Sequence, residues 1–228
     1  MKLSVIVPAY NEGGTLRAIV EKVRAVNVEK EIIIVNDAST DNTQQAAEEI
    51  KKDFSDIKIA HHPINRGKGA AIKTGLALAT GEIVLVQDAD LELDPKDYPA
   101  LMKPIEEGRT AVVYGSRELG TRNKHLYFSF YIGGKMVSLF ANILFGAHLT
   151  DVPTGYKVMR TDVLRSLRLQ CERFDFDPEV TAKILKRGIQ IIEVPIAYYP
   201  RTKADGKKIG WRDGISALWT LLKYRVIG

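Results

Sequence analysis

Residues 82–92, with the sequence EIVLVQDADLE, decide how this chain is expected to fold. The apolar run at 83–86 is typical of a strand that is buried on both faces. Two carboxylates, Asp88 and Asp90, follow this strand directly, and a carboxylate without a partner is costly to bury. A divalent cation at the carboxyl edge of a parallel sheet would account for both side chains. The alternative is a solvated turn with two N-capping aspartates.

Strands and helices alternate through the first half of the chain. Apolar runs predict strands at residues 3–7, 31–36, 58–61, 83–86 and 110–114. Apolar residues at helical spacing predict helices at 15–26, 68–79 and 97–107, and another that ends near residue 52 with Ser39 or Thr40 as its N-cap. This alternation favours right-handed crossovers and a mainly parallel sheet, so we predict a doubly wound, Rossmann-like α/β fold.

The second half of the chain is expected to add helices to this sheet. Residues 126–145 are rich in aromatic and aliphatic side chains and predict a helix or helix pair, either part of the core or an amphipathic surface at a bilayer interface. Further helices are expected after Thr161 or Asp162, at Asp177 with Pro178 in its first turn, and as an amphipathic C-terminal helix. The last strand is expected at 190–195. Since no linker interrupts the sequence, we predict one domain over 1–228.

Composition limits the possible partners and compartments. The chain has 228 residues, of which 45% are hydrophobic, and a formal net charge of +5. This mildly basic balance favours phosphates or an anionic membrane surface as partners, and nothing in the sequence indicates nucleic acid. The single cysteine, Cys171, excludes an internal disulfide and favours the reducing cytoplasm. We expect neither a signal peptide nor a membrane span, because the longest uncharged run, 136–150, is shorter than the roughly twenty residues that a span needs.

Polar residues follow three of the predicted strands, where each strand ends. Because the carboxyl ends of parallel strands lie side by side, we expect Tyr10, Glu12, Asp37, Asp88 and Asp90 to share one crevice. An aromatic ring with acceptors suits a nucleobase, and two aspartates suit a diphosphate bound to Mg²⁺ or Mn²⁺. Lys68, between two glycines, is placed to reach a ribose or phosphate; the alternative is that this glycine-rich segment is only a flexible turn.

Six motifs occur in a fixed order along the chain: PAYNE at 8–12, VNDASTDNT at 35–43, NRGKGAAIKTG at 65–75, QDADLELDP at 87–95, YGSR at 114–117 and TGYKVMR at 154–160. Together they resemble the family-two glycosyltransferases of the GT-A fold. More narrowly, they are similar to the dolichyl- or polyprenyl-phosphate sugar synthases, such as the dolichol-phosphate mannose synthases. The resemblance covers nearly the whole chain. It implies a nucleotide-sugar-binding half at 1–117 and an acceptor-side half at 118–228.

The resemblance also implies roles for individual residues. Residues that contact the nucleotide are Pro8, Tyr10, Glu12 and Asp37, with Lys68 beside them. Asp88 and Asp90 would hold the metal and the diphosphate, and Glu92 stands where the mannose synthases often place a glutamine that faces the metal. Arg117 matches the position that meets the acceptor phosphate. Lys135 is our candidate for a second basic contact with the acceptor.

A basic segment at 201–212 precedes the C-terminal helix. Its cations include Arg201, Lys203, Lys207 and Lys208, against the single acid Asp205. The segment is predicted to close over the diphosphate as a lid, and the alternative is a solvated loop.

The predicted reaction is metal-dependent, inverting transfer of a hexose, mannose or glucose, from GDP-mannose or UDP-glucose to a polyprenyl or dolichyl phosphate. We expect it at the cytoplasmic face of a membrane, with peripheral membrane contact. A lipid phosphate is already ionised and needs no general base, whereas a hydroxyl acceptor would need one, for which Asp177 and Glu179 are candidates. These two acids could instead only stabilise a helix N-terminus. A non-catalytic nucleotide-sugar-binding subunit is a further alternative, and an aspartyl phosphatase, which also uses an Asp-x-Asp pair, is the last.

Overall fold

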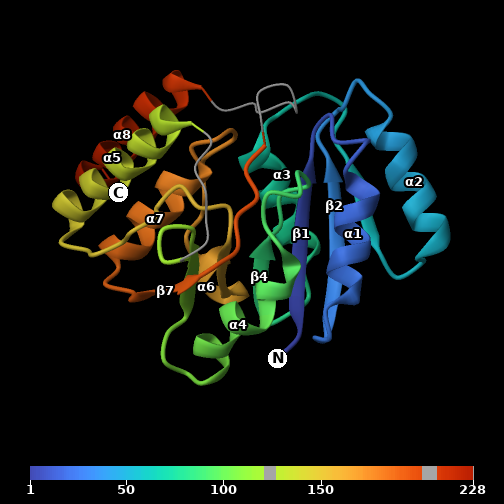
Figure 1. Ribbon diagram of the computed structural model, residues 1–228, viewed down its shortest axis with the longest axis horizontal. Helices are drawn as coiled ribbons and strands as arrows, with labels where there is room; N and C mark the ends of the chain where they lie inside the picture. Colours follow the sequence, from blue (N-terminus) through green and yellow to red (C-terminus); the bar gives the residue numbers. More distant parts are fainter. Residues whose placement is uncertain (121–126, 202–209, 228) are drawn as a thin grey trace.

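The computed structural model describes residues 1–120, 127–201 and 210–227 (Figure 1). In these residues a seven-stranded sheet consists of β1 (Leu3–Ala9), β2 (Lys30–Asn36), β3 (Lys58–His61), β4 (Ile83–Val86), β5 (Val112–Ser116), β6 (Lys157–Arg160) and β7 (Ile191–Pro195). The helices are α1 (Leu16–Ala25), α2 (Thr43–Asp53), α3 (Lys68–Leu78), α4 (Tyr98–Glu106), α5 (Phe128–Phe145), α6 (Thr161–Ser166), α7 (Phe176–Lys186) and α8 (Trp211–Val226), with a short 3₁₀ turn at Pro95–Asp97.

The strand order is β3-β2-β1-β4-β6-β5-β7. All the strands run in one direction except β6, which is antiparallel to both β4 and β5. The predicted mainly parallel α/β sheet is therefore confirmed. The strand β6 was not predicted, because it lies outside the strand–helix alternation of the first half of the chain.

Helices cover both faces of the sheet, because the central strands carry apolar residues on both faces. Alternate residues of β1 point to opposite faces: Val5 and Val7 join a core cluster with α1, α2 and α4, whereas Ile6 joins a cluster with α3, α6 and α7. The sheet is thus buried between two layers of helices. This leaves the carboxyl ends of β1, β2 and β4 together at one edge.

A third cluster lies outside these layers and packs α5 and α8 against α7. Figure 1 shows α5 and α8 side by side at one end of the molecule, and α1 and α2 at the other. The predicted aromatic segment forms one helix, α5, which ends at Gly146 in the left-handed conformation (φ 64°) that glycine adopts without strain. No helix in the described part of the chain is long and apolar enough to cross a membrane.

Three predicted helix starts were wrong. Helix α2 begins at Thr43, because Ser39 is hydrogen-bonded to Asn36 and the backbone N–H of Thr43 donates to Asp41 Oδ1 at 2.9 Å. Helix α7 begins one residue before Asp177. Helix α6 begins at Thr161 itself, which lies inside the helix and not before it.

Candidate active site

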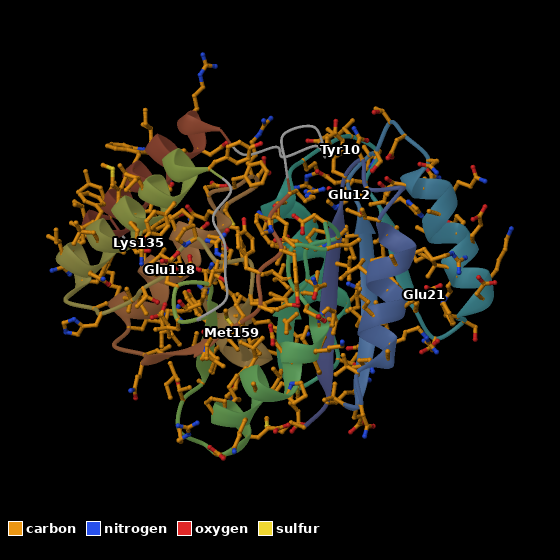
Figure 2. The ribbon with its side chains drawn as sticks, viewed as in Figure 1. Tyr10, Glu12, Glu21, Glu118, Lys135 and Met159 are labelled. Atoms are coloured by element: carbon orange, nitrogen blue, oxygen red, sulfur yellow. The ribbon has the colours of Figure 1, made fainter. Side chains whose placement is uncertain are left out.

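A cavity of about 440 Å³ opens at the carboxyl ends of β1, β2 and β4. Its wall contains eleven of the residues singled out in the sequence: Pro8, Tyr10, Glu12, Asp37, Lys68, Asp88, Asp90, Glu92, Arg117, Asp177 and Arg201. Figure 2 shows Tyr10 and Glu12 just beyond the carboxyl end of β1. The strand-end residues that were expected to share one crevice therefore lie together around one cavity.

Asp37 organises the glycine-rich turn on one side of this cavity. Its buried carboxylate accepts hydrogen bonds from the backbone N–H groups of Arg66 at 2.9 Å and Gly67 at 2.6 Å, and it lies 2.7 Å from His62 Nδ1. Gly67 has a φ of 92°, and a Cβ built there would lie 2.6 Å from the carbonyl oxygen of Glu172. Only glycine fits this turn, which places Lys68 at the first position of α3.

Lys68 forms an ion pair with Asp88, with 2.6 Å between Nζ and Oδ1. Burial alone would lower the pKa of Lys68, but Asp88, and after it Asp177, raise it well above its usual range. The cavity therefore holds this ammonium group permanently charged beside Asp88.

Asp90 lies in a strongly negative part of the cavity. Burial, Asp88 and Glu92 raise the pKa of Asp90 to about 7, against the opposing effects of Arg201 and of a hydrogen bond from the Glu92 N–H. The guanidinium of Arg201 is 3.1 Å from Asp90 Oδ2 and 3.3 Å from Glu12 Oε2, while its backbone N–H donates to Glu92 Oε1 at 3.0 Å. A group of carboxylates at this spacing requires a cation, and Arg201 supplies it here.

The predicted metal ligands do not form a complete site. Among the residues that the structure describes, no group of three or more Asp, Glu, His or Cys side chains has the geometry of a metal site. Asp88 is paired with Lys68 and Asp90 with Arg201, while Glu92 accepts from the main chain. Their oxygen donors and crowded negative charge nevertheless suit a hard divalent cation that also has ligands from a bound diphosphate.

Arg117 also lies in the wall of the cavity and is fixed by Asp151. Its Nε and Nη2 donate to the two carboxylate oxygens at 2.8 and 2.7 Å, and its backbone N–H donates to Asp151 Oδ2 at 2.9 Å. The guanidinium also lies 5.2 Å from the centre of the Tyr198 ring. This arrangement presents a rigid, permanently charged group to the cavity.

Lys135 does not lie in the cavity wall. Its Nζ is 2.7 Å from Glu118 Oε2, and Figure 2 shows this pair well away from Tyr10 and Glu12. The predicted lid residues Lys203, Lys207 and Lys208 lie outside the described residues.

The sequence reasoning missed several residues of the wall, among them Gly155, Phe174 and Tyr198, and it considered Asp177 as a base or as a stabiliser of a helix N-terminus, not as a residue that binds the donor. Tyr198 follows β7, which runs parallel to β5, so the rule that located Tyr10 and Asp37 also applies to it. Glu179, the other candidate base, is fully buried; it accepts from the N–H groups of Gln170 and Cys171 and pairs with Lys183.

Comparison with known proteins agrees with this geometry. The family model "Glycosyl transferase family 2" matches residues 4–168. An undecaprenyl-phosphate mannosyltransferase from Micrococcus luteus is 29% identical, with 99% of each chain covered. A dolichyl-phosphate beta-glucosyltransferase from Trichomonas vaginalis is 31% identical over 98% of this chain and 73% of its own length.

Solved structures support the same fold. Glucosyl-3-phosphoglycerate synthase from Mycobacterium tuberculosis, in complex with UDP, matches all of this chain and 81% of its own with a TM-score of 0.76 at 20% identity. The complex of that synthase with Mn²⁺, UDP-glucose and glycerol 3-phosphate gives a TM-score of 0.73. These matches confirm the GT-A fold. Because the family model covers well over half of its length, the chain belongs to glycosyl transferase family 2 and is a glycosyltransferase.

Proposed function

We propose that this glycosyltransferase moves one hexose, mannose or glucose, from a nucleotide-sugar to a polyprenyl or dolichyl phosphate, with inversion and with a divalent cation. The observation that carries the proposal is the cavity at the carboxyl ends of β1, β2 and β4, whose wall contains the carboxylates Asp88 and Asp90 together with the guanidinium of Arg117. The names of the relatives, which are polyprenyl-phosphate mannosyl- and glucosyltransferases, support the acceptor class.

The donor is assigned to the side of the cavity formed by residues 1–117. Tyr10, Glu12 and Asp37 suit a nucleoside, and Lys68 lies beside Asp88 where a diphosphate would be held. Asp88 and Asp90 would bind Mg²⁺ or Mn²⁺, which stabilises the charge of a departing diphosphate as a Lewis acid. Glu92 is retained as a third candidate ligand, although it would first have to give up its bond to the Arg201 main chain.

The acceptor phosphate is assigned to Arg117. A guanidinium that Asp151 holds through two hydrogen bonds is oriented before substrate arrives, and preorganised charge is a large part of catalysis. A lipid phosphate is already ionised near neutral pH and attacks without a general base. This agrees with the placement of Glu179, which is buried away from the cavity.

Peripheral contact with a membrane is part of the proposal, and the outer faces of α5 and α8 support it. Exposed apolar side chains gather there, including Leu139 and Ile143 on α5 and Ile215 and Trp219 on α8, the last 65% exposed. Basic residues such as Lys223 lie on the same helices. Within Phe128–Phe145 and Trp211–Val226 the one acidic residue is Asp213, in the first turn of α8. An amphipathic, basic surface of this kind suits the interface of an anionic bilayer, which we place at the cytoplasmic face.

The test is incubation of the protein with a polyprenyl phosphate, Mn²⁺ or Mg²⁺, and labelled GDP-mannose, GDP-glucose, UDP-glucose and UDP-mannose in separate reactions. We expect a lipid-linked sugar with one of these donors, with product only when metal is present. The matched control is polyprenol, which has the same chain without the phosphate and should give no product. If no donor yields a lipid product, the acceptor assignment is wrong. If polyprenol reacts as well as its phosphate, the hydroxyl-acceptor alternative is the correct one.

A further inference from the structure

The ammonium group of Lys157 is fully buried directly behind the cavity wall. Its Nζ lies 2.7 Å from Asp177 Oδ1, 2.9 Å from the carbonyl oxygen of Val152 and 2.7 Å from that of Thr154. A lysine ammonium has three N–H donors, so each has an acceptor. Burying such a charge is costly unless it is fully paired, which indicates that Lys157 holds something the site requires in a fixed position.

What Lys157 holds is Asp177, in the first turn of α7 and in the wall of the cavity. The main chain of Asp177 is held as well, because Thr181 Oγ1 donates to its carbonyl oxygen at 2.8 Å and Tyr114 Oη lies 2.9 Å from Thr181 Oγ1. Lys157 occupies Oδ1, and no hydrogen bond to Oδ2 occurs among the residues that the structure describes. Because Asp177 lines the cavity and Lys157 holds Oδ1, Oδ2 is the carboxylate oxygen left for a group in the cavity.

The turn that accepts from Lys157 leads to the diphosphate side of the site. The turn whose carbonyls it binds continues into Gly155, where a Cβ would lie 2.7 Å from Asp88 Oδ2. Asp88 is also paired with Lys68, and Asp177 is close enough to Lys68 to help raise its pKa. Asp177 thus borders the Lys68–Asp88 pair, next to the place where the diphosphate is proposed to bind.

We infer that Asp177 accepts hydrogen bonds from hydroxyl groups of the donor hexose and positions that sugar for transfer. The inference rests on the proposed function. It names a residue that contacts the sugar of the donor, which the residues assigned to the nucleotide do not reach. A hexose is attached directly to the diphosphate, so it must lie beside Asp88 and Lys68, within the part of the wall that Asp177 forms. In the proposed reaction the acceptor phosphate needs no base, which leaves hydroxyl recognition as the role of this carboxylate.

A fixed acceptor also provides selectivity. A site built to hydrogen-bond a hydroxyl discriminates strongly against an analogue whose hydroxyl is absent or points elsewhere, because the polar group of the protein is then left without its partner. Asp177 should therefore contribute to the choice between hexoses that differ at one carbon.

The test compares Asp177→Asn with the wild type by calorimetry, using UDP, GDP, UDP-glucose and GDP-mannose with Mn²⁺. In the variant the amide oxygen still accepts from Lys157, so an NH₂ group replaces the acceptor that faces the cavity. We expect the affinity for the preferred nucleotide-sugar to fall by about tenfold or more, the loss typical of a hydrogen bond to a charged group. Affinity for the matching nucleoside diphosphate should stay within about twofold, which also shows that the variant is folded. The control is Asp175→Asn, two residues away, where an amide oxygen can still accept from the N–H of Arg173.

Three results would overturn the inference. The variant could bind both ligands as the wild type does, or it could lose both in equal proportion. It could also bind the nucleotide-sugar normally and lose turnover at saturating donor with an altered pH profile, which would make Asp177 a general base. A wild type that binds nucleoside diphosphates but no nucleotide-sugar would instead contradict the proposed function itself.

Discussion

Replacing Glu31 with glutamine should make the stability of this protein much less sensitive to acid. Glu31 lies in β2, and its buried carboxylate connects β1, β3 and the turn before β4. It accepts hydrogen bonds from Ser4 Oγ at 2.5 Å, from the Thr80 N–H at 2.6 Å and from the Gly81 N–H at 3.1 Å, and it pairs with Lys58 Nζ at 2.9 Å. Removing the charge from this carboxylate weakens all of these contacts at once.

The size of the effect follows from the pKa of the group. Burial would raise the pKa of Glu31, but the hydrogen bonds from Ser4, Lys58 and Thr80 outweigh it and lower the pKa from 4.5 to about 2. At 1.36 kcal/mol per unit, this shift is worth about 3 kcal/mol of stability for the ionised group. Because the pKa is lowered on folding, the contribution is complete above about pH 5 and is lost as the pH falls, with about 2 kcal/mol gone by pH 3.

The assay is urea unfolding, followed by circular dichroism, at several pH values between 7 and 3. We expect Glu31→Gln to be about 2–3 kcal/mol less stable than the wild type at pH 7 and to lie much closer to it at pH 3. Comparing the two proteins at each pH removes the contribution of the other carboxylates. Glu29→Gln, an exposed neighbour, is the matched control and should follow the wild type throughout. Parallel stability curves for wild type and Glu31→Gln would refute the reasoning.

Three further substitutions test the cavity itself. Gly67→Ala should destabilise the protein by about 1–3 kcal/mol in urea, because its φ is 92° and the new Cβ would meet Glu172, whereas Gly14→Ala has open space and should be nearly neutral. Asp90→Asn should lower turnover by roughly a hundredfold or more and weaken Mn²⁺ binding in the presence of the nucleoside diphosphate, while full activity would contradict the metal role. Arg117→Lys keeps the charge but loses the bidentate hydrogen bonds to Asp151, so KM for the lipid phosphate should rise by about tenfold without a change in nucleotide affinity. If the affinities for the lipid phosphate and for the nucleotide fall equally, Arg117 has a structural role only.

Much of the donor side of the site could be predicted because its geometry follows from a simple rule. Apolar runs identify the buried strands, and parallel strands place their carboxyl ends side by side. Tyr10, Asp37 and Asp88 therefore lie around one cavity although 78 residues separate the first from the last. No information about side-chain packing was needed for this result.

The acceptor side was predicted less well, because there the positions depend on contacts between elements. Whether Lys135 reaches the cavity is decided by how α5 rotates against α7 and α8, and the structure pairs it with Glu118 outside the wall. The antiparallel strand β6 lies outside the strand–helix alternation on which the prediction relied, and β6 contains Lys157, which is buried.

The position of Asp177 shows how these two kinds of information combine. As a sequence feature it was an acid near the start of a helix, for which dipole stabilisation and general-base chemistry were both reasonable interpretations. Burial changes that balance, because a lysine with no exposed surface binds one of its oxygens and so fixes the direction of the other. A carboxylate that only stabilised the N-terminus of α7 would not need a buried positive charge from strand β6. The cost of burying Lys157 is therefore the strongest physical argument that Asp177 acts on a ligand.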